Sequence, residues 1–288
     1  MSSHHAISEH TINTGEQTVR YIAAGSEGIP IVFVHGWPQC ADEFRHVMRH
    51  LSGKYRLFAM DLRGIGGTTT PSQDWTKETL AHDLHAFVQT LELERPIVIG
   101  HDIGGAVAYA HGRLFSENLR GIGVLDLPLP GLAPWDDVVM SAMAWHFDFH
   151  GQKPLAEDLV SGRQKTYLRY FYDQVAFRPE AISDEDVDLY AAAYETRDQL
   201  TAGFELYRAF PIDAEFGRKH TAKFELPMLL AGGSHACGQM REDISGALKQ
   251  NGVTNLTSVV IEDSGHWVCD EQPEATATVI DSFAEKLL

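Results

Sequence analysis

Asp102 stands between two glycines at the point where an apolar run gives way to a helical pattern. The run at 97–99 leads into Gly100-His101-Asp102-Ile103-Gly104, and a pattern typical of an amphipathic helix covers 103–114. This is the strand–nucleophile–helix turn G-x-S-x-G with aspartate in the place of serine. The glycines leave space beside a strained turn. The alternative is an aspartate that only caps the helix, so the rest of the chain must distinguish the two roles.

A carboxylate in this turn suits a different reaction from a serine. Serine attacks carbonyl groups, whereas a carboxylate can displace a leaving group from a saturated carbon. The product is an ester whose carbonyl belongs to the enzyme, and water must then hydrolyse it. The turn therefore indicates epoxides or alkyl halides as substrates, rather than esters or peptides.

Hydrolysis of such an ester needs hydrogen-bond donors for a developing oxyanion. The apolar run at 31–34 ends in His35-Gly36-Trp37-Pro38. A His-Gly-x-Pro segment after a strand can contribute one backbone N–H, here from Trp37, and the residue after the nucleophile, Ile103, contributes the second. Each such donor lowers the barrier by roughly 3 kcal/mol. The alternative for this segment is an ordinary Gly-Pro turn.

A base and an orienting acid complete the predicted catalytic group. His266 lies in Asp263-Ser264-Gly265-His266-Trp267, after the last apolar run, where a nucleophile–acid–histidine order places the base. The segment after the run at 228–230 contains no carboxylate. Asp126 instead follows the run at 121–125, and we predict that it orients His266. The other candidates for this role are Glu242 and Asp243, at the start of a helical pattern.

These residues belong to an alternation of buried strands and amphipathic helices. Strands are predicted over 18–24, 31–34, 57–60, 97–99, 121–125, 228–230 and 258–261, and helices over 79–91, 103–114 and 273–287. This pattern predicts an α/β fold with a mostly parallel central sheet covered on both faces. Strand-like runs are missing between 131 and 224. We therefore predict a core of 1–130 and 223–288 with a helical cap of 131–222 over the carboxyl edge of the sheet.

Ring opening of an epoxide would need a proton donor from the cap, because an alkoxide is a poor leaving group. The candidates are Tyr167, Tyr170, Tyr172, Tyr190, Tyr194, Tyr207 and His146. Composition alone does not choose among them. The run His146-x-Asp148-x-His150 does not place all three side chains on one helix face, so no metal site is predicted there, and no cofactor is expected.

Composition narrows the classes of molecule that the protein is expected to bind. The chain of 288 residues has 23 basic and 40 acidic residues and a formal net charge of −17, which disfavours nucleic acids and anionic membranes as partners. Three cysteines without C-x-x-C spacing are typical of a cytoplasmic protein, and the first ten residues do not read as a secretory signal. A small-molecule substrate is expected. A homodimer is left open.

Taken together, these motifs resemble the α/β-hydrolase family and, within it, the epoxide hydrolases of the bacterial Cif type. The matching stretches are His101-Asp102-Ile103-Gly104, Trp145-His146-Phe147, residues 204–209, Leu230-Ala-Gly-Gly and Gly265-His266-Trp267. The resemblance implies an α/β-hydrolase fold with an inserted helical cap. It also implies that His146 and Tyr207 are the ring-opening pair. Aromatic walls from Trp37, Trp145 and Phe147 then suggest an uncharged, apolar epoxide.

The chain departs from the Cif type in two features, and two classes of dehalogenase offer an alternative resemblance. Cif-type members can be secreted, and this chain lacks a recognisable signal. They also carry a glutamate where Asp126 stands. The rivals are haloalkane and haloacetate dehalogenases, which are similar in sequence and use the same nucleophile. Fluoroacetate dehalogenases hold a carboxylate with arginines at the positions of Ile103 and Ala106, and haloalkane dehalogenases hold the halide with a tryptophan at the position of Ile103. Neither feature is present here.

Overall fold

An eight-stranded sheet organises residues 6–288, the part of the chain that the computed structural model describes. Its strands are β1 (Ser8–Asn13), β2 (Thr18–Ala24), β3 (Pro30–Val34), β4 (Arg56–Met60), β5 (Ile97–His101), β6 (Gly121–Leu125), β7 (Met228–Gly233) and β8 (Leu256–Ile261). They lie in the order β1-β2-β4-β3-β5-β6-β7-β8. The pairs β1–β2 and β2–β4 are antiparallel, and all later pairs are parallel. Parallel strands end at the same edge, so the loops that follow them meet there.

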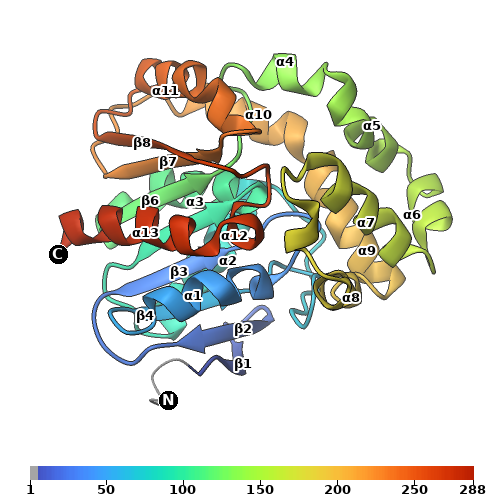
Figure 1. Cartoon of the computed structure of the whole chain (residues 1–288), viewed down its shortest axis with the longest axis horizontal. Helices are drawn as coiled ribbons and strands as arrows, with labels where there is room; N and C mark the ends of the chain where they lie inside the picture. The colour runs from blue at the N-terminus through green and yellow to red at the C-terminus, as the bar shows by residue number, and fades with distance from the viewer. Residues whose placement is uncertain (1–5) are drawn as a thin grey trace.

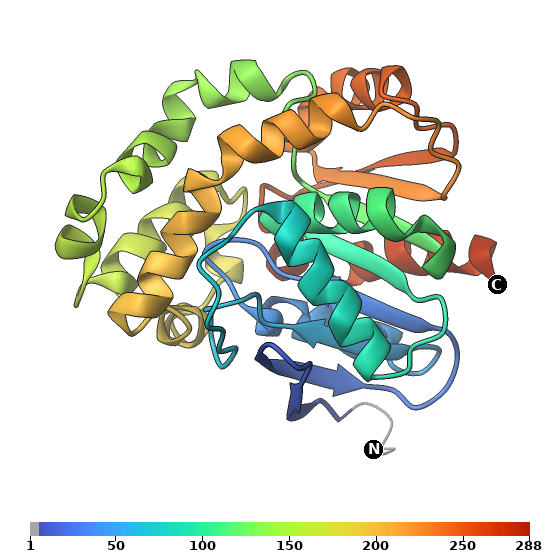
Figure 2. The ribbon, with the colours of Figure 1, turned by 180° about the vertical axis from the view of Figure 1, so that it is seen from behind.

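Helices cover both faces of the sheet, as its fully buried central strands require. On one face lie α1 (Arg45–Leu51), the short α12 (Val268–Glu271) and α13 (Pro273–Ala284), packed on the apolar layer around Phe33, Leu57 and Ile99. On the other face lie α2 (Lys77–Thr90), α3 (Ile103–Phe115) and α11 (Arg241–Gln250), packed around Val32, Val98 and Leu230. The two faces are seen in turn in Figure 1 and Figure 2.

A run of helices joins β6 to β7. It comprises α4 (Trp135–Val139), α5 (Trp145–Gly151), α6 (Leu155–Val160), α7 (Gln164–Val175), α8 (Asp184–Ala192), α9 (Arg197–Arg208) and α10 (Phe210–Lys219). Capping boxes from Ser183 and Thr196 fix where α8 and α9 begin. These helices gather at one end of the sheet, beside the carboxyl ends of the parallel strands (Figure 1).

The α/β fold and the helical stretch between β6 and β7 are confirmed, and each predicted strand lies within an observed one. The strand β1 was missed because its sequence, Ser-Glu-His-Thr-Ile-Asn, is polar and almost wholly exposed. The predicted final helix ends as an α-helix at Ala284 and continues as a 3-10 turn. The prediction about a signal segment falls partly on residues 1–5, outside the described residues. Within 6–288, no helix combines the length and apolarity needed to cross a membrane.

Candidate active site

Asp102 occupies a strained turn between β5 and α3. Its backbone has φ 47° and ψ −125°, a region that side-chain-bearing residues rarely adopt. A Cβ added to Gly104 would lie 2.0 Å from the carbonyl oxygen of Val34, so only glycine permits this close approach of helix and strand. The Asp102 N–H donates to the carbonyl of Leu125 at 2.9 Å, which ties the turn to β6. The turn thus holds the carboxylate at the carboxyl edge of the sheet.

The two predicted oxyanion donors come from the loop after β3 and from the start of α3. The Trp37 N–H, in the loop after β3, donates to Asp102 Oδ2 at 3.1 Å. Ile103 is the first residue of α3, so its N–H has no carbonyl partner within the helix. A backbone amide therefore holds Oδ2 of Asp102, whereas Oδ1 takes no part in that hydrogen bond.

His266 and Asp126 form a hydrogen-bonded pair in which Asp126 is buried and His266 is partly exposed. His266 Nδ1 lies 2.6 Å from Asp126 Oδ2. The other Asp126 oxygen accepts the N–H groups of Gly233 at 2.8 Å and Cys237 at 3.2 Å. The carboxylate favours the Nδ1–H tautomer, which leaves the Nε2 lone pair of His266 free to accept a proton. By contrast, Glu242 is exposed and pairs with Arg241 next to it.

A second carboxylate, which no motif in the sequence indicates, holds the His266 loop. Glu271, in α12, is 3 % exposed. Its Oε2 accepts backbone N–H groups from Phe177, Arg178 and Gly265 at 2.8–3.0 Å, and its Oε1 accepts the N–H of Trp267 at 3.0 Å. Two of these donors flank His266 in sequence, so Glu271 fixes the backbone on both sides of His266.

A buried ion pair, which no motif in the sequence indicates, includes His101, the residue that precedes Asp102. His101 Nε2 donates to the carbonyl of His266 at 2.9 Å, and its Nδ1 lies 3.4 Å from Glu43 Oε1. Burial alone would lower the pKa of His101, but the Glu43 carboxylate beside it raises that pKa to about 9. His101 is therefore a cation at neutral pH, next in sequence to Asp102 and bonded to the His266 backbone.

Trp37 links this polar edge to the helices above it. While its backbone contacts Asp102, its ring packs among aromatic side chains from α5, α7 and α9. The ring centroids lie 5.9 Å from His146, 4.9 Å from Phe171 and 5.2 Å from Tyr207. The rings of His146 and Tyr207 are 5.2 Å apart. The structure thus brings the predicted ring-opening pair together beside Trp37.

Burial keeps both members of that pair neutral. Desolvation raises the pKa of Tyr207 well above its usual value, and the nearby Asp102 charge adds to this effect. Desolvation lowers the pKa of His146 to about 4. At neutral pH both side chains are uncharged, and each can present a hydrogen-bond donor to a bound oxygen.

Hydrogen bonding separates Tyr207 from the other candidate tyrosines. The hydroxyls of Tyr172, Tyr190 and Tyr194 donate to protein acceptors, and Tyr167 is 2.8 Å from His150 Nε2. Tyr170 is 44 % exposed. Among the described residues, the Tyr207 hydroxyl has no hydrogen-bond partner, so it is available to a ligand.

The two remaining predicted wall residues differ in burial. Phe147 lies against Tyr207, with ring centroids 5.0 Å apart. Trp145 stacks over Phe171 at 5.8 Å but is 41 % exposed. Phe147 therefore belongs to the interior of the aromatic cluster, whereas Trp145 lies at its outer rim.

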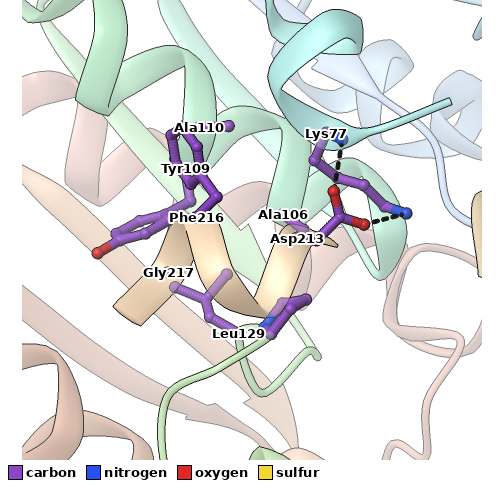
Figure 3. A pocket seen from close by; sticks show the side chains of 9 residues that line it. Lys77, Ala106, Tyr109, Ala110, Leu129, Asp213, Phe216 and Gly217 are labelled. Carbon is purple, nitrogen blue, oxygen red and sulfur yellow. Dashed lines mark hydrogen bonds and ion pairs between the residues drawn. The ribbon is translucent and has the colours of Figure 1, made fainter. Parts of the chain in front are cut away.

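The surroundings of Ala106 bear on the alternative function, a dehalogenase that would hold a substrate carboxylate at this position. Ala106 lines a cavity of about 20 Å³ with Lys77 and Asp213. Figure 3 shows the side chains that line it. This volume accommodates a water molecule. Lys77 is buried and bound to Asp213 at 2.8 Å through both its ammonium and its backbone N–H, so its charge is already paired. No free cation faces this space among the residues described.

The chain belongs to the α/β hydrolase family, whose model matches residues 31–279. It is 31% identical over 275 residues to the soluble epoxide hydrolase of Corynebacterium sp. (strain C12), covering 93% of this chain and 94% of that protein. The structure of the epoxide hydrolase CorEH without ligand superposes with a TM-score of 0.89 at 30% identity, over 98% of this chain and 100% of the other.

A third similar protein supports a likeness in fold only, because its sequence identity to this chain is low. The Cif epoxide hydrolase from Acinetobacter nosocomialis superposes with a TM-score of 0.85 at 20% identity, over 98% of this chain and 90% of that chain. The family resemblance inferred from the motifs is confirmed, and named epoxide hydrolases stand among the chain's relatives.

Proposed function

We propose that this protein is an epoxide hydrolase that converts an uncharged, apolar epoxide into a vicinal diol through a covalent ester of Asp102. The observation that carries the proposal is a carboxylate in the nucleophile turn, joined through Trp37 to a neutral Tyr207–His146 pair whose tyrosine hydroxyl has no hydrogen-bond partner among the described residues. The relatives named epoxide hydrolases support the same reaction. Residues 131–222 act as a cap, and 1–130 with 223–288 act as the core.

In the first half-reaction, Asp102 is the nucleophile. Its Oδ2 is held by the Trp37 N–H, so Oδ1 attacks the less hindered epoxide carbon. The carbon–oxygen bond of the ring breaks as a new bond to Oδ1 forms. Tyr207 and His146 hydrogen-bond the epoxide oxygen, and Tyr207 gives it a proton. The product is a hydroxyalkyl ester of Asp102.

In the second half-reaction, His266 is the base. With Asp126 holding Nδ1–H, His266 Nε2 takes a proton from water, and the hydroxide adds to the Asp102 carbonyl carbon. The oxyanion is stabilised by the N–H groups of Trp37 and Ile103. Collapse releases the diol, which takes its proton back from His266. The proton left on the regenerated carboxyl restores Tyr207 through solvent.

A substrate panel scored for two products tests the proposal. Styrene oxide and 1,2-epoxyhexane should give diols, whereas 1-chlorobutane and fluoroacetate should release no halide. Ile103 offers no indole for a halide, and Ala106 and the paired Lys77 offer no free cation for a carboxylate. Halide release from either halogenated compound, with no diol from any epoxide, would make the protein a dehalogenase. Cytoplasmic location stays a prediction.

A further inference from the structure

We infer that the cap does more than supply the ring-opening pair: Tyr172 and Tyr194 are positioning residues that assemble the oxyanion hole by hydrogen-bonding the loop of residues 35–39. This inference rests on the proposed function and assigns these two tyrosines to its second half-reaction. It therefore makes ester hydrolysis, and not only ring opening, depend on how the cap is docked.

The loop is held from the cap at two successive carbonyls. The Tyr172 hydroxyl, from α7, donates to the carbonyl of Pro38 at 2.8 Å. The Tyr194 hydroxyl, from the segment between α8 and α9, donates to the carbonyl of Gln39 at 2.8 Å. Both tyrosines are fully buried. The two residues whose carbonyls they hold follow directly after Trp37, whose N–H donates to Asp102.

A third connection holds the side chain of the same loop. Gln39 Nε2 donates to Asp270 Oδ2 at 2.6 Å, and the Tyr190 hydroxyl of α8 donates to Asp270 Oδ1 at 2.8 Å. Asp270 lies in α12, directly after the segment that carries His266. The cap, the loop and the base segment thus share one buried hydrogen-bond network.

The direction of charge movement explains why this network should affect one half-reaction selectively. During alkylation, negative charge leaves Asp102, so the Trp37 N–H stabilises the starting carboxylate at least as much as the transition state. During hydrolysis, charge develops on the Asp102 carbonyl oxygen, so the same donor stabilises the transition state. A misplaced loop therefore leaves alkylation intact and slows hydrolysis.

The roles of the tyrosines also differ from that of Tyr207 by their partners. The hydroxyls of Tyr172 and Tyr194 are each used by a loop carbonyl, whereas the hydroxyl of Tyr207 has no partner among the described residues. Removing the first two should therefore affect the loop, and removing the third should affect ring opening. The two effects fall on different rate constants and can be separated.

Tyr172→Phe, Tyr194→Phe and the double variant test the inference, measured by quenched-flow intact mass with the epoxide that the wild-type enzyme turns over best. Each single variant should form the alkyl-enzyme within about twofold of the wild-type rate and hydrolyse it about tenfold more slowly. This is a smaller effect than the roughly 10²–10³-fold caused by deleting an oxyanion donor outright. The double variant should accumulate the ester during turnover, and its KM should fall with kcat.

Tyr170→Phe is the matched control, because it removes the same hydroxyl from an exposed position on the same helix. It should leave both steps unchanged. An alkylation burst equal to the enzyme concentration shows that a variant is folded. If the double variant does not fold, the two single variants are enough to test the inference. Unchanged hydrolysis, or equal slowing of both steps, would overturn the inference. Absence of alkyl-enzyme and diol with the wild-type enzyme would instead overturn the proposed function.

Discussion

The two halves of the candidate site are built in different ways. On the sheet side, every charged group has a fixed partner: Asp102 has the Trp37 N–H, and Asp126 has His266 and two amides. On the cap side, His146 and Tyr207 are held by ring packing, and the Tyr207 hydroxyl meets no acceptor among the described residues. The first half is organised by hydrogen bonds, and the second by aromatic packing.

This difference corresponds to two chemical tasks. A carboxylate, an imidazole and an oxyanion need donors and acceptors that are in place before the reaction, because reorienting them during it would raise the barrier. A ring-opening donor must instead remain free for the substrate oxygen and stay neutral, which burial achieves. Substitutions of His266 and Asp126 on the sheet side should therefore block ester hydrolysis, and substitutions of Tyr207 and His146 on the cap side should block ester formation.

The largest expected effect is that of His266→Gln. It removes the base of hydrolysis, while alkylation needs only the carboxylate. Hydrolysis should slow by about 10⁵–10⁶-fold. Intact-mass measurement after mixing with an epoxide should show an adduct equal to the substrate mass. Normal turnover by this variant would remove His266 from the mechanism.

Asp126→Asn should have the next largest effect. The substitution removes the charge that orients and stabilises His266 and favours the wrong tautomer, so hydrolysis should fall by about 10⁴-fold with little change in alkylation. Pre-steady-state kinetics separates the two steps. Glu242→Gln serves as the control, since that carboxylate is exposed on α11. If the two variants exchanged behaviour, the orienting acid would be Glu242.

On the cap side, Tyr207→Phe and His146→Phe should each slow alkylation by about 10²-fold, within the usual range for a general acid. Each donor can partly replace the other, so the double variant should lose more than either single one. The rate of ester hydrolysis should not change. Variants that form the ester normally but hydrolyse it slowly would reverse the assignment of the two halves.

The smallest expected effect is a change in the pH dependence of stability. It tests, at a residue outside the site, whether burial keeps histidines neutral. His111, in α3, is fully buried and lies against His85 of α2. Neither of its ring nitrogens has a hydrogen-bond partner among the described residues, and burial lowers its pKa to about 3. The unfolded chain binds a proton here below about pH 6.5, while the folded chain does not. The stability contributed by His111 is therefore present above this pH and is lost as the pH falls.

His111→Leu isolates this contribution. Between pH 7 and pH 5 the free energy of unfolding should fall by about 2 kcal/mol less in the variant than in the wild type, because all other titrating groups are the same in both. Urea unfolding at the two pH values measures the difference. An equal fall in both proteins would mean that burial does not depress histidine pKa values here, and the neutral state assigned to His146 would lose its support.

Most of the sheet side could be predicted from the sequence, because each of its motifs is a short continuous segment of the chain. The glycines around Asp102, the His-Gly-Trp-Pro segment and the Gly-His-Trp segment each sit at the end of an apolar run, and parallel strands bring those ends to one edge. Glu271 and Glu43 were missed because their roles depend on loops folding onto them. The spacing around either residue carries no sign of this.

The cap side could not be predicted from the residues alone. Six tyrosines and His146 were equivalent by composition, and only the family resemblance selected Tyr207 and His146. The helices supply the missing information, because packing decides which hydroxyls meet an acceptor. Tyr172, Tyr190 and Tyr194 do, and Tyr207 does not. The short, polar β1 was missed for a related reason, since it has no apolar alternation to reveal it.

The central claim is that Asp102, and not a water molecule, attacks the substrate. A single turnover in ¹⁸O-water, with enzyme in excess over epoxide, tests it most directly. Because the first diol oxygen comes from the carboxylate, attack by Asp102 should give an unlabelled diol and one ¹⁸O in the peptide that contains Asp102, read by mass spectrometry. Label in the diol, with none in that peptide, would mean direct attack by water and would remove Asp102 as the nucleophile.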